Sequence, residues 1–326
     1  MAAAPYCTVV IPTKNAMPGF KGVLAAVLRQ ETPWSFDVIV IDSGSRDETV
    51  AYAEGQPNVK VVRIAPEEFG HGRTRNQAIA ATRAPFVALL THDAQPTDEK
   101  WLAHLVAAVE QDGRVAGAFG RHIAWPDANP FTKRDIERHF AGFLAYPLVV
   151  HKELDEQKYA NDIAWRQFLH FYSDNNSCLR RAVWERISYP DIEFAEDQTW
   201  ARQIIEKGYA KAYAPDAVVY HSHDYGLFER LQRSFDESRN FKAYFGYRLA
   251  ADPWQALRSI AGLSWTDLKY ALREPRGTIS PITLVRRLMS DMMVVTGHYL
   301  GSHYESIPLA WQRALSRDYR VFSTTR

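Results

Sequence analysis

Short apolar runs alternate with segments of helical periodicity over the first 110 residues of this 326-residue chain. Four of these runs are rich in β-branched residues and predict strands over residues 6–12, 36–42, 59–64 and 85–90. The apolar spacing between them predicts helices over 20–28, 46–55 and 74–83, with a further helix beginning near Thr97. Almost continuously apolar strands that alternate with helices indicate a mostly parallel α/β sheet covered on both faces.

Periodicity weakens beyond residue 120. Residues 121–174 are aromatic, charged and interrupted by prolines, and we expect an irregular stretch there. A strand over 176–181 running into a short helix, a helix over 194–208 and a strand pair over 211–215 and 217–223 follow. The sequence after Tyr225 is basic, and its apolar spacing predicts helices. We therefore expect an α/β domain over 1–225 and a helical C-terminal region over 226–326.

The charge balance excludes some classes of function. Lys and Arg number 39 and Asp and Glu 38, so no overall basic footprint points to nucleic acid, and an anionic ligand would need a local site. Cys7 and Cys178 form neither a disulfide framework nor a CxxC pair, which is typical of a cytoplasmic protein. We see no signal-peptide pattern and no apolar run long enough to span a membrane.

Polar residues follow three of the predicted strands. In parallel α/β sheets the ligand crevice lies beyond the carboxyl ends of the strands, so the segments 12–15, 42–45 and 91–94 are the first candidates for binding. Neither GxGxxG nor GxxxxGK[ST] follows the first strand, which argues against a dinucleotide-binding dehydrogenase and against a P-loop protein.

Two of the polar segments suit a nucleotide. Asp42 precedes a Ser-Gly-Ser turn whose N–H groups and hydroxyls could hold a base and ribose; helix capping is the alternative. Arg73, Arg75 and Asn76 lie where a helix opens, a natural contact for a pyrophosphate, and a solvated basic turn is the alternative.

Metal chemistry is suggested by Asp93, which follows the fourth strand in a Thr-His-Asp-Ala-Gln-Pro loop. A carboxylate there could hold Mg²⁺ or Mn²⁺; helix capping is the alternative, although Thr97 is better placed for it. His221 and His223 alternate along the predicted last strand, so we expect them on opposite faces and only one of them at the site.

Glu196 and Asp197 open a predicted helix. Acidic residues there favour the helix dipole, which is one explanation for the pair. The other is a general base directed at an acceptor hydroxyl.

The ordered motifs IPTKN, IDSGSRDET, HGRTRNQA, LLTHDAQP, SDNNSCLRR, FAEDQTWA and VVYHSH resemble family 2 glycosyltransferases of the GT-A fold over residues 6–225, and most of all bacterial rhamnosyltransferase-like members. The resemblance implies that the base and ribose pocket is lined by Pro12, Thr13, Asn15, Asp42, Ser43 and Gly44. It places Arg75 and Asn76 beside the nucleotide and its phosphates.

The segment Thr91-His92-Asp93 stands where the family usually carries an Asp-x-Asp metal motif. Because the first acid is Thr91, the resemblance leaves Asp93 as the only carboxylate of the motif and implies either weaker metal binding or help from His221 or His223, of which His221 fits the family's Val-Tyr-His ending better. Glu196-Asp197 matches the Glu-Asp motif, so Asp197 would remove the proton of the acceptor hydroxyl in a single inverting displacement.

The subgroup resemblance implies dTDP-L-rhamnose as donor and a surface glycan, free or lipid-linked, as acceptor. Three alternatives stay open: a UDP-sugar donor, a nucleotide-sugar-binding module without catalysis, and a sugar nucleotidyltransferase, which would need a glycine-rich loop after the first strand. The helical tail carries Arg286, Arg287, Arg313 and Arg317 among aromatic residues. Contact with the inner membrane face and formation of a homodimer are two expectations for it.

Overall fold

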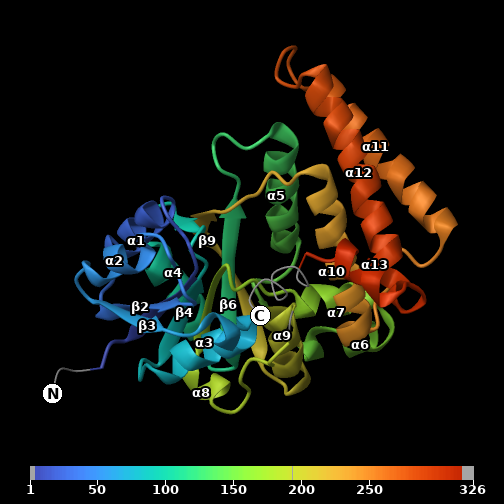
Figure 1. The fold of residues 1–326 in the computed structure, drawn as a ribbon. Coiled ribbons are helices and arrows are strands. Elements are labelled where there is room, and N and C mark those ends of the chain that lie inside the picture. The colour runs from blue at the N-terminus through green and yellow to red at the C-terminus, as the bar shows by residue number, and fades with distance from the viewer. Residues whose placement is uncertain (1–3, 193, 318–326) are drawn as a thin grey trace. The chain divides into compact units, whose positions relative to one another are not determined.

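The computed structural model describes residues 4–192 and 194–317 (Figure 1). Its chain contacts divide into two compact units, one formed by residues up to Pro126 with Asp135–Ser222 and the other by Asp127–Arg134 with the residues from His223 onwards. Each unit has its own internal packing.

The elements of the first half are β1 (Cys7–Thr13), α1 (Phe20–Leu28), β2 (Phe36–Asp42), α2 (Thr49–Glu54), β3 (Val59–Arg63), α3 (His71–Ala80), β4 (Phe86–Leu90), β5 (Gln95–Pro96), α4 (Trp101–Glu110) and β6 (Val115–Ile123). They are followed by α5 (Pro130–Gly142), β7 (Val149–Val150), α6 (Glu156–Asn161), α7 (Ile163–His170), β8 (Asn176–Arg180), α8 (Arg181–Trp184), α9 (Glu196–Glu206) and β9 (Ala210–Tyr220). The second unit holds α10 (Leu227–Phe245), α11 (Pro253–Arg273), α12 (Pro281–Ser302) and α13 (Leu309–Leu315). Short 3₁₀ turns lie at Pro66–Glu68, Phe143–Ala145, Lys152–Leu154 and Tyr304–Ser306.

The strands of the described chain form one mixed sheet in the order β3-β2-β1-β4-β8-β6-β9-β5, with β7 paired to β9. Strands β3, β2, β1 and β4 are adjacent and mutually parallel. β6 is parallel to β9, and β8 runs antiparallel to both of its neighbours, β4 and β6. The predicted α/β class, with helices flanking a mostly parallel sheet, is confirmed.

Both faces of the inner strands β1 and β4 are buried, which explains their apolar runs. Within β1, Val9 and Ile11 pack into a core with α1 and α4, whereas Val10 points into a second core with α3 and α9. Successive side chains of a strand point to opposite faces, so most positions carry apolar residues, while the buried Thr8 hydroxyl is satisfied by hydrogen bonds with Asp37 and Thr82.

The structure differs from the sequence expectation in several places. The stretch 121–174, predicted to be irregular, contains α5, α6 and α7. Helix α3 begins at His71, earlier than predicted, and α4 begins at Trp101 after the short strand β5. The predicted strand pair is the single strand β9, with a register irregularity where β6 passes from Gly120 to Arg121.

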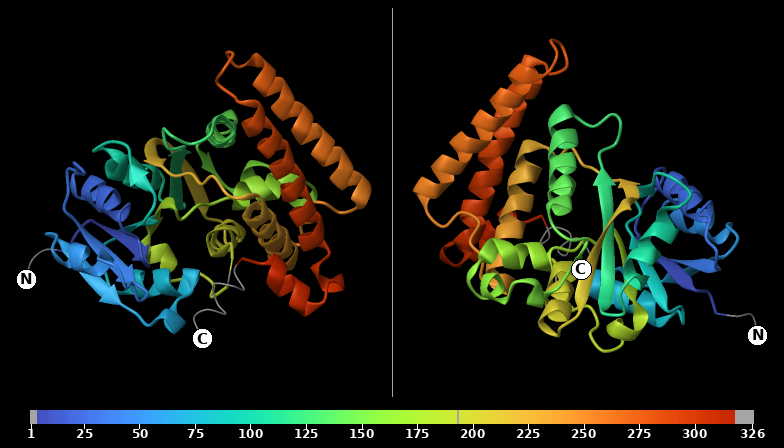
Figure 2. Two further views of the ribbon diagram at one scale, coloured as in Figure 1. Left: turned by 45° about the horizontal axis from the view of Figure 1, so that its top comes forward. Right: turned by 180° about the vertical axis from the view of Figure 1, so that it is seen from behind.

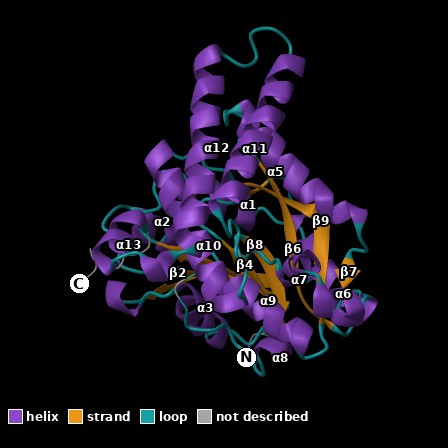
Figure 3. Ribbon diagram, turned by 90° about the vertical axis from the view of Figure 1, so that its right-hand side faces the viewer, coloured by secondary structure: helices purple, strands orange, loops and turns teal. Residues whose placement is uncertain are grey.

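The second unit is helical, and α11 and α12 form a long hairpin within it (Figures 2 and 3). α12 packs closely on α10 at Gly301. A Cβ at this position would lie 2.4 Å from the Phe235 carbonyl oxygen, so only glycine fits there. Buried Asp267 of α11 is paired with Arg287 of α12 and with Arg134. Among the described residues, no helix has both the length and the apolarity needed to cross a membrane.

Candidate active site

The strand register brings the polar segments to one edge of the sheet. Thr13 and Asp42 are register partners at the carboxyl ends of β1 and β2. Leu90 at the end of β4 pairs with Asn176 at the start of antiparallel β8. The segments that follow β4 and precede β8 therefore share this edge, and the sheet topology carries the ends of β6 and β9 to the same edge.

Asp42 is buried and organises the turn after β2. One carboxylate oxygen accepts a hydrogen bond from the Thr13 hydroxyl at 3.0 Å, and the other accepts from the N–H groups of Gly44 and Ser45 at 3.0 and 2.8 Å. Gly44 has a φ of +88°, which glycine adopts without strain. The Ser43 hydroxyl donates to the Thr13 carbonyl at 3.2 Å. Hydrogen bonds within the protein therefore fix the shape of this turn. Its contact with a base and ribose stays a prediction.

Asn15 joins this turn to the end of β1. Its N–H donates to the Ser45 hydroxyl at 2.8 Å, and its side-chain oxygen accepts from the Arg46 N–H at 2.8 Å. The Pro12 carbonyl lies 3.3 Å from Nδ1 of His92. The predicted nucleotide-contacting segments from β1, β2 and β4 are therefore linked to one another.

Arg73 and Asn76, two of the predicted phosphate contacts, lie in different environments. Arg73 is exposed, and its Nε donates to Asp191 at 3.2 Å. The Asn76 amide is engaged within the protein: it donates to the Tyr189 carbonyl at 2.9 Å and accepts from the Trp184 indole at 2.7 Å. Their roles toward a nucleotide stay predictions, and Arg73 is the more accessible of the two.

Arg75 is buried. Its guanidinium donates a hydrogen bond to Glu196 and a second one, of 3.2 Å, to the His71 carbonyl, and its Nε lies 3.3 Å from Asp174 Oδ2. Burial alone would lower the pKa of Arg75, but Glu196 and Asp174 outweigh it and raise that pKa. Arg75 is a permanent cation among carboxylates.

The acidic pair opens α9 after Ala195, which has a left-handed φ of 56°. Glu196 is buried, whereas Asp197 is partly exposed and its Oδ2 accepts the Asp174 N–H at 3.2 Å. Burial raises the pKa of Asp197 well above its usual range, the negative charges of Glu196 and Asp174 add to this, and Arg75 opposes it. Of the two acids, Asp197 is the one that a substrate could reach as a general base.

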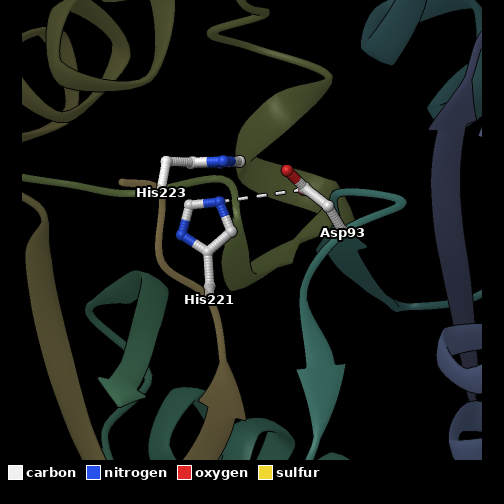
Figure 4. Close-up of side chains that lie close together, drawn as sticks. All are labelled: Asp93, His221 and His223. Atoms are coloured by element: carbon white, nitrogen blue, oxygen red, sulfur yellow. Dashed lines mark ion pairs between the residues drawn. The ribbon is translucent and has the colours of Figure 1, made fainter. Parts of the chain in front are cut away.

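Asp93, His221 and His223 come together beyond β4 and β9 (Figure 4). One ligand atom from each lies within 4.8 Å of the others, and His221 Nε2 is 3.7 Å from Asp93 Oδ1. The expectation that only one histidine faces the site is wrong, because β9 ends at Tyr220 and strand alternation stops before His221. The Thr91 hydroxyl is buried without a hydrogen-bond partner among the described residues.

The donor chemistry of this cluster fits a divalent cation. One carboxylate oxygen and two imidazole nitrogens converge on a small volume, and a modest movement of the side chains would bring all three to one ion. Mg²⁺ prefers oxygen ligands, whereas Mn²⁺ accepts imidazole more readily. Asp93, His221 and His223 are therefore the residues that could hold such an ion.

Two residues near the site were missed by the sequence reasoning. His122 of β6 is buried, its ring lies 5.2 Å from the His221 ring, and its Nε2 has no hydrogen-bond partner in the described chain. Burial, and then the neighbouring His221, lower the pKa of His122 well below its usual range. Asp174 belongs to the SDNNSCLRR motif, but nothing in its spacing distinguishes it from a surface residue.

Comparison with known proteins gives the family. The model of glycosyl transferase family 2 matches residues 8–187. The chain is 32% identical to the O-antigen chain rhamnosyltransferase RfbN of Salmonella typhimurium, over 95% of this chain and 93% of that protein. It is 30% identical to the O-antigen chain rhamnosyltransferase WbaN of Salmonella anatum, over 96% and 94%.

Solved structures support the same fold. The mannosyltransferase PcManGT from Pyrobaculum calidifontis, in complex with GDP-Man and Mn²⁺, aligns with a TM-score of 0.55 at 19% identity, over 99% of this chain and 84% of that one. S. aureus TarS residues 1–349, in complex with UDP-GlcNAc, aligns with a TM-score of 0.52 at 14% identity, over 92% and 91%. The chain has the GT-A fold, belongs to glycosyl transferase family 2 and is a glycosyltransferase.

Proposed function

We propose that this enzyme transfers L-rhamnose from dTDP-L-rhamnose, with inversion, to a hydroxyl of an O-antigen or a similar bacterial surface glycan. The observation that carries the proposal is the identity of 32% and 30%, over almost the whole chain, with two proteins named O-antigen chain rhamnosyltransferases. The partly exposed acid at the start of α9 supplies the chemical group that the reaction needs.

The proposed reaction is a single displacement. Asp197 accepts the proton of the acceptor hydroxyl while the hydroxyl oxygen attacks the anomeric carbon. The bond from that carbon to the diphosphate oxygen breaks on the opposite side, and dTDP leaves with the electron pair. A raised pKa makes the Asp197 carboxylate a stronger base than an ordinary surface aspartate. A divalent cation bound by Asp93, His221 and His223 would supply positive charge to the diphosphate.

Calorimetric titration of the enzyme with dTDP, UDP and GDP, each with Mn²⁺ and after EDTA, tests the donor. We expect dTDP to bind most tightly, and only with the metal, because the diphosphate is the group that the cation would contact. Preference for UDP would retain the fold and the mechanism but exclude rhamnose as the donor. Absence of binding to all three would favour a non-catalytic member, an alternative that Thr91 in place of an acid motivates.

We also propose that the enzyme works at the inner membrane face, with the α11–α12 hairpin lying on anionic lipid. The hairpin exposes Trp254, Leu257, Trp265, Leu272, Ile282, Val285, Met289 and Met292. Arg258, Lys269, Arg273, Arg276 and Arg286 are exposed on the same two helices and their connection, whereas the acids Asp267 and Asp291 are buried and Glu274 is half-buried. An apolar face bordered by cations complements an anionic bilayer surface.

The double variant Trp265→Ser/Leu272→Ser tests this surface. We expect the unaltered enzyme to float with vesicles containing phosphatidylglycerol, less so at high salt, and the variant to remain unbound. Phe228→Ser removes a comparably exposed aromatic residue of α10 and serves as control. Vesicle binding that survives in the double variant contradicts the proposal. The proposal is also contradicted if light scattering shows that the unaltered enzyme dimerises without vesicles and that the double variant does not. That result would assign the hairpin face to a second copy of the chain.

A further inference from the structure

Arg75 and Arg73 begin the same helix, yet their surroundings suit opposite roles. The Arg73 side chain is 46% exposed and reaches a surface aspartate, whereas the Arg75 side chain is 6% exposed. The partners of Arg75 are buried as well, since the Asp174 and Glu196 side chains are 0% and 7% exposed. A donor diphosphate would have to enter this interior to reach the Arg75 guanidinium.

The Arg75 guanidinium is engaged by the protein through Nη1 and through an ion pair at Nε, which makes no hydrogen bond within the described chain. Nη1 donates to Glu196 and to the His71 carbonyl, while Nε faces Asp174. Moving the guanidinium to a phosphate would leave Glu196 and Asp174 buried without their counter-ion, which is strongly unfavourable. The present contacts of Arg75 are therefore the stable ones.

These contacts lead directly to the acid that we propose as the base. Asp174 donates its N–H to Asp197 Oδ2 at 3.2 Å. The other Asp174 carboxylate oxygen accepts from the Tyr189 hydroxyl at 2.9 Å and from the Ser177 hydroxyl at 2.7 Å. Glu196 is the neighbour of Asp197 in the first turn of α9. Arg75 thus pairs with both acids that flank Asp197. Asp174 contacts Asp197 by a hydrogen bond, and Glu196 precedes it in the chain.

We propose that Arg75 is a positioning residue that keeps Asp174 and Glu196 in place around Asp197, and that it does not contact the donor phosphates. The inference rests on the proposed role of Asp197 as the general base. If an arginine of α3 contacts the donor phosphates, this proposal assigns that contact to the exposed Arg73. A single cation among three carboxylates also limits how far the pKa of Asp197 rises.

Arg75→Lys tests the inference, because lysine keeps the charge but lacks the planar fork that reaches two acids. We expect the affinity for the preferred nucleotide to stay within about two-fold of the unaltered enzyme. We expect turnover to fall by about 100-fold, since a displaced catalytic group is costly. The rising limb of the pH–rate profile should move to higher pH, because a weaker cation contact lets the pKa of Asp197 rise. Arg83→Lys, on an exposed arginine just beyond α3, is the matched control.

Unfolding provides a readout that does not depend on the donor. The titratable groups around Arg75 are His71, Asp174, Tyr189, Glu196 and Asp197, and Tyr172 faces Asp174. Burial raises the pKa of Asp174 to about 6 despite Arg75, so the folded state binds more protons than the unfolded state just below that pH, and stability falls as the pH rises through this window. In Arg75→Lys the acids lose part of their counter-ion. Its melting temperature should therefore fall further below that of the unaltered enzyme as the pH rises, whereas Arg83→Lys should show no such trend.

The outcomes separate the two proposals. If the unaltered enzyme does not turn over dTDP-L-rhamnose, the proposed donor fails, while nucleotide binding and unfolding still test Arg75. The inference is overturned if Arg75→Lys loses nucleotide affinity by as large a factor as it loses turnover. It is also overturned if the melting temperature of Arg75→Lys depends on pH in the same way as that of Arg83→Lys. Should Arg75→Lys not fold, Asp174→Asn replaces it: removing a negative neighbour lowers the pKa of Asp197, so the rising limb should move to lower pH, and an unmoved limb contradicts the inference.

Discussion

Replacing Asp197 with asparagine is expected to lower rhamnose transfer by about 10²–10⁴-fold, the usual contribution of a general base. Asparagine keeps the size of the side chain but cannot accept the proton of the acceptor hydroxyl. Nucleotide affinity should be unchanged, because the variant removes the base and leaves the cation-binding residues in place. The measurement is transfer of labelled rhamnose from dTDP-L-rhamnose to lipid-linked O-antigen oligosaccharide, paired with calorimetric titration of dTDP.

The environment of Asp197 adds a pH dependence to this prediction. Since burial and the neighbouring acids raise its pKa, transfer by the unaltered enzyme should increase with pH, with a midpoint above the ordinary range of an aspartate. Asp216→Asn, at an exposed acid of β9, is the control and should retain full transfer. Substantial residual transfer in Asp197→Asn would move the role of base to Glu196.

Replacing Asp93 with alanine is expected to abolish metal-dependent nucleotide binding. Asp93 contributes the carboxylate of the cluster with His221 and His223, and two imidazoles alone would hold a hard divalent cation weakly. Calorimetry with dTDP and Mn²⁺ should show no more binding by Asp93→Ala than by the unaltered enzyme in EDTA. His221→Ala should lower the affinity for Mn²⁺ while leaving residual binding.

Glu99→Gln, which changes an exposed acid of the segment after the Asp93 loop, is the matched control and should bind dTDP normally. The metal assignment would be refuted if the unaltered enzyme bound dTDP equally well with Mn²⁺ and with EDTA. It would also be refuted if Asp93→Ala kept a metal-dependent affinity.

The alternation of strands and helices was predictable because each apolar run reports burial at its own position. In β1, β2 and β4 both faces are largely covered, so most residues of each run are apolar, and this pattern is visible without knowledge of the rest of the chain. The polar residues at the strand ends were predictable for the same reason, since parallel strands end at one edge. The helices of 121–174 were not predicted, because α5, α6 and α7 are short or strongly charged and the prolines of this stretch obscure their apolar faces.

The sequence by itself determined the α/β class and which acids and histidines were candidates for chemistry, because both depend on local pattern. Tertiary structure alone decided which of them meet. Arg75 and Glu196 are 121 positions apart, so no spacing rule could assign Arg75 to a carboxylate rather than to a phosphate. The end of β9 at Tyr220 likewise placed both histidines beside Asp93. Contacts of this kind depend on how strands and helices pack, and a one-dimensional pattern does not contain that information.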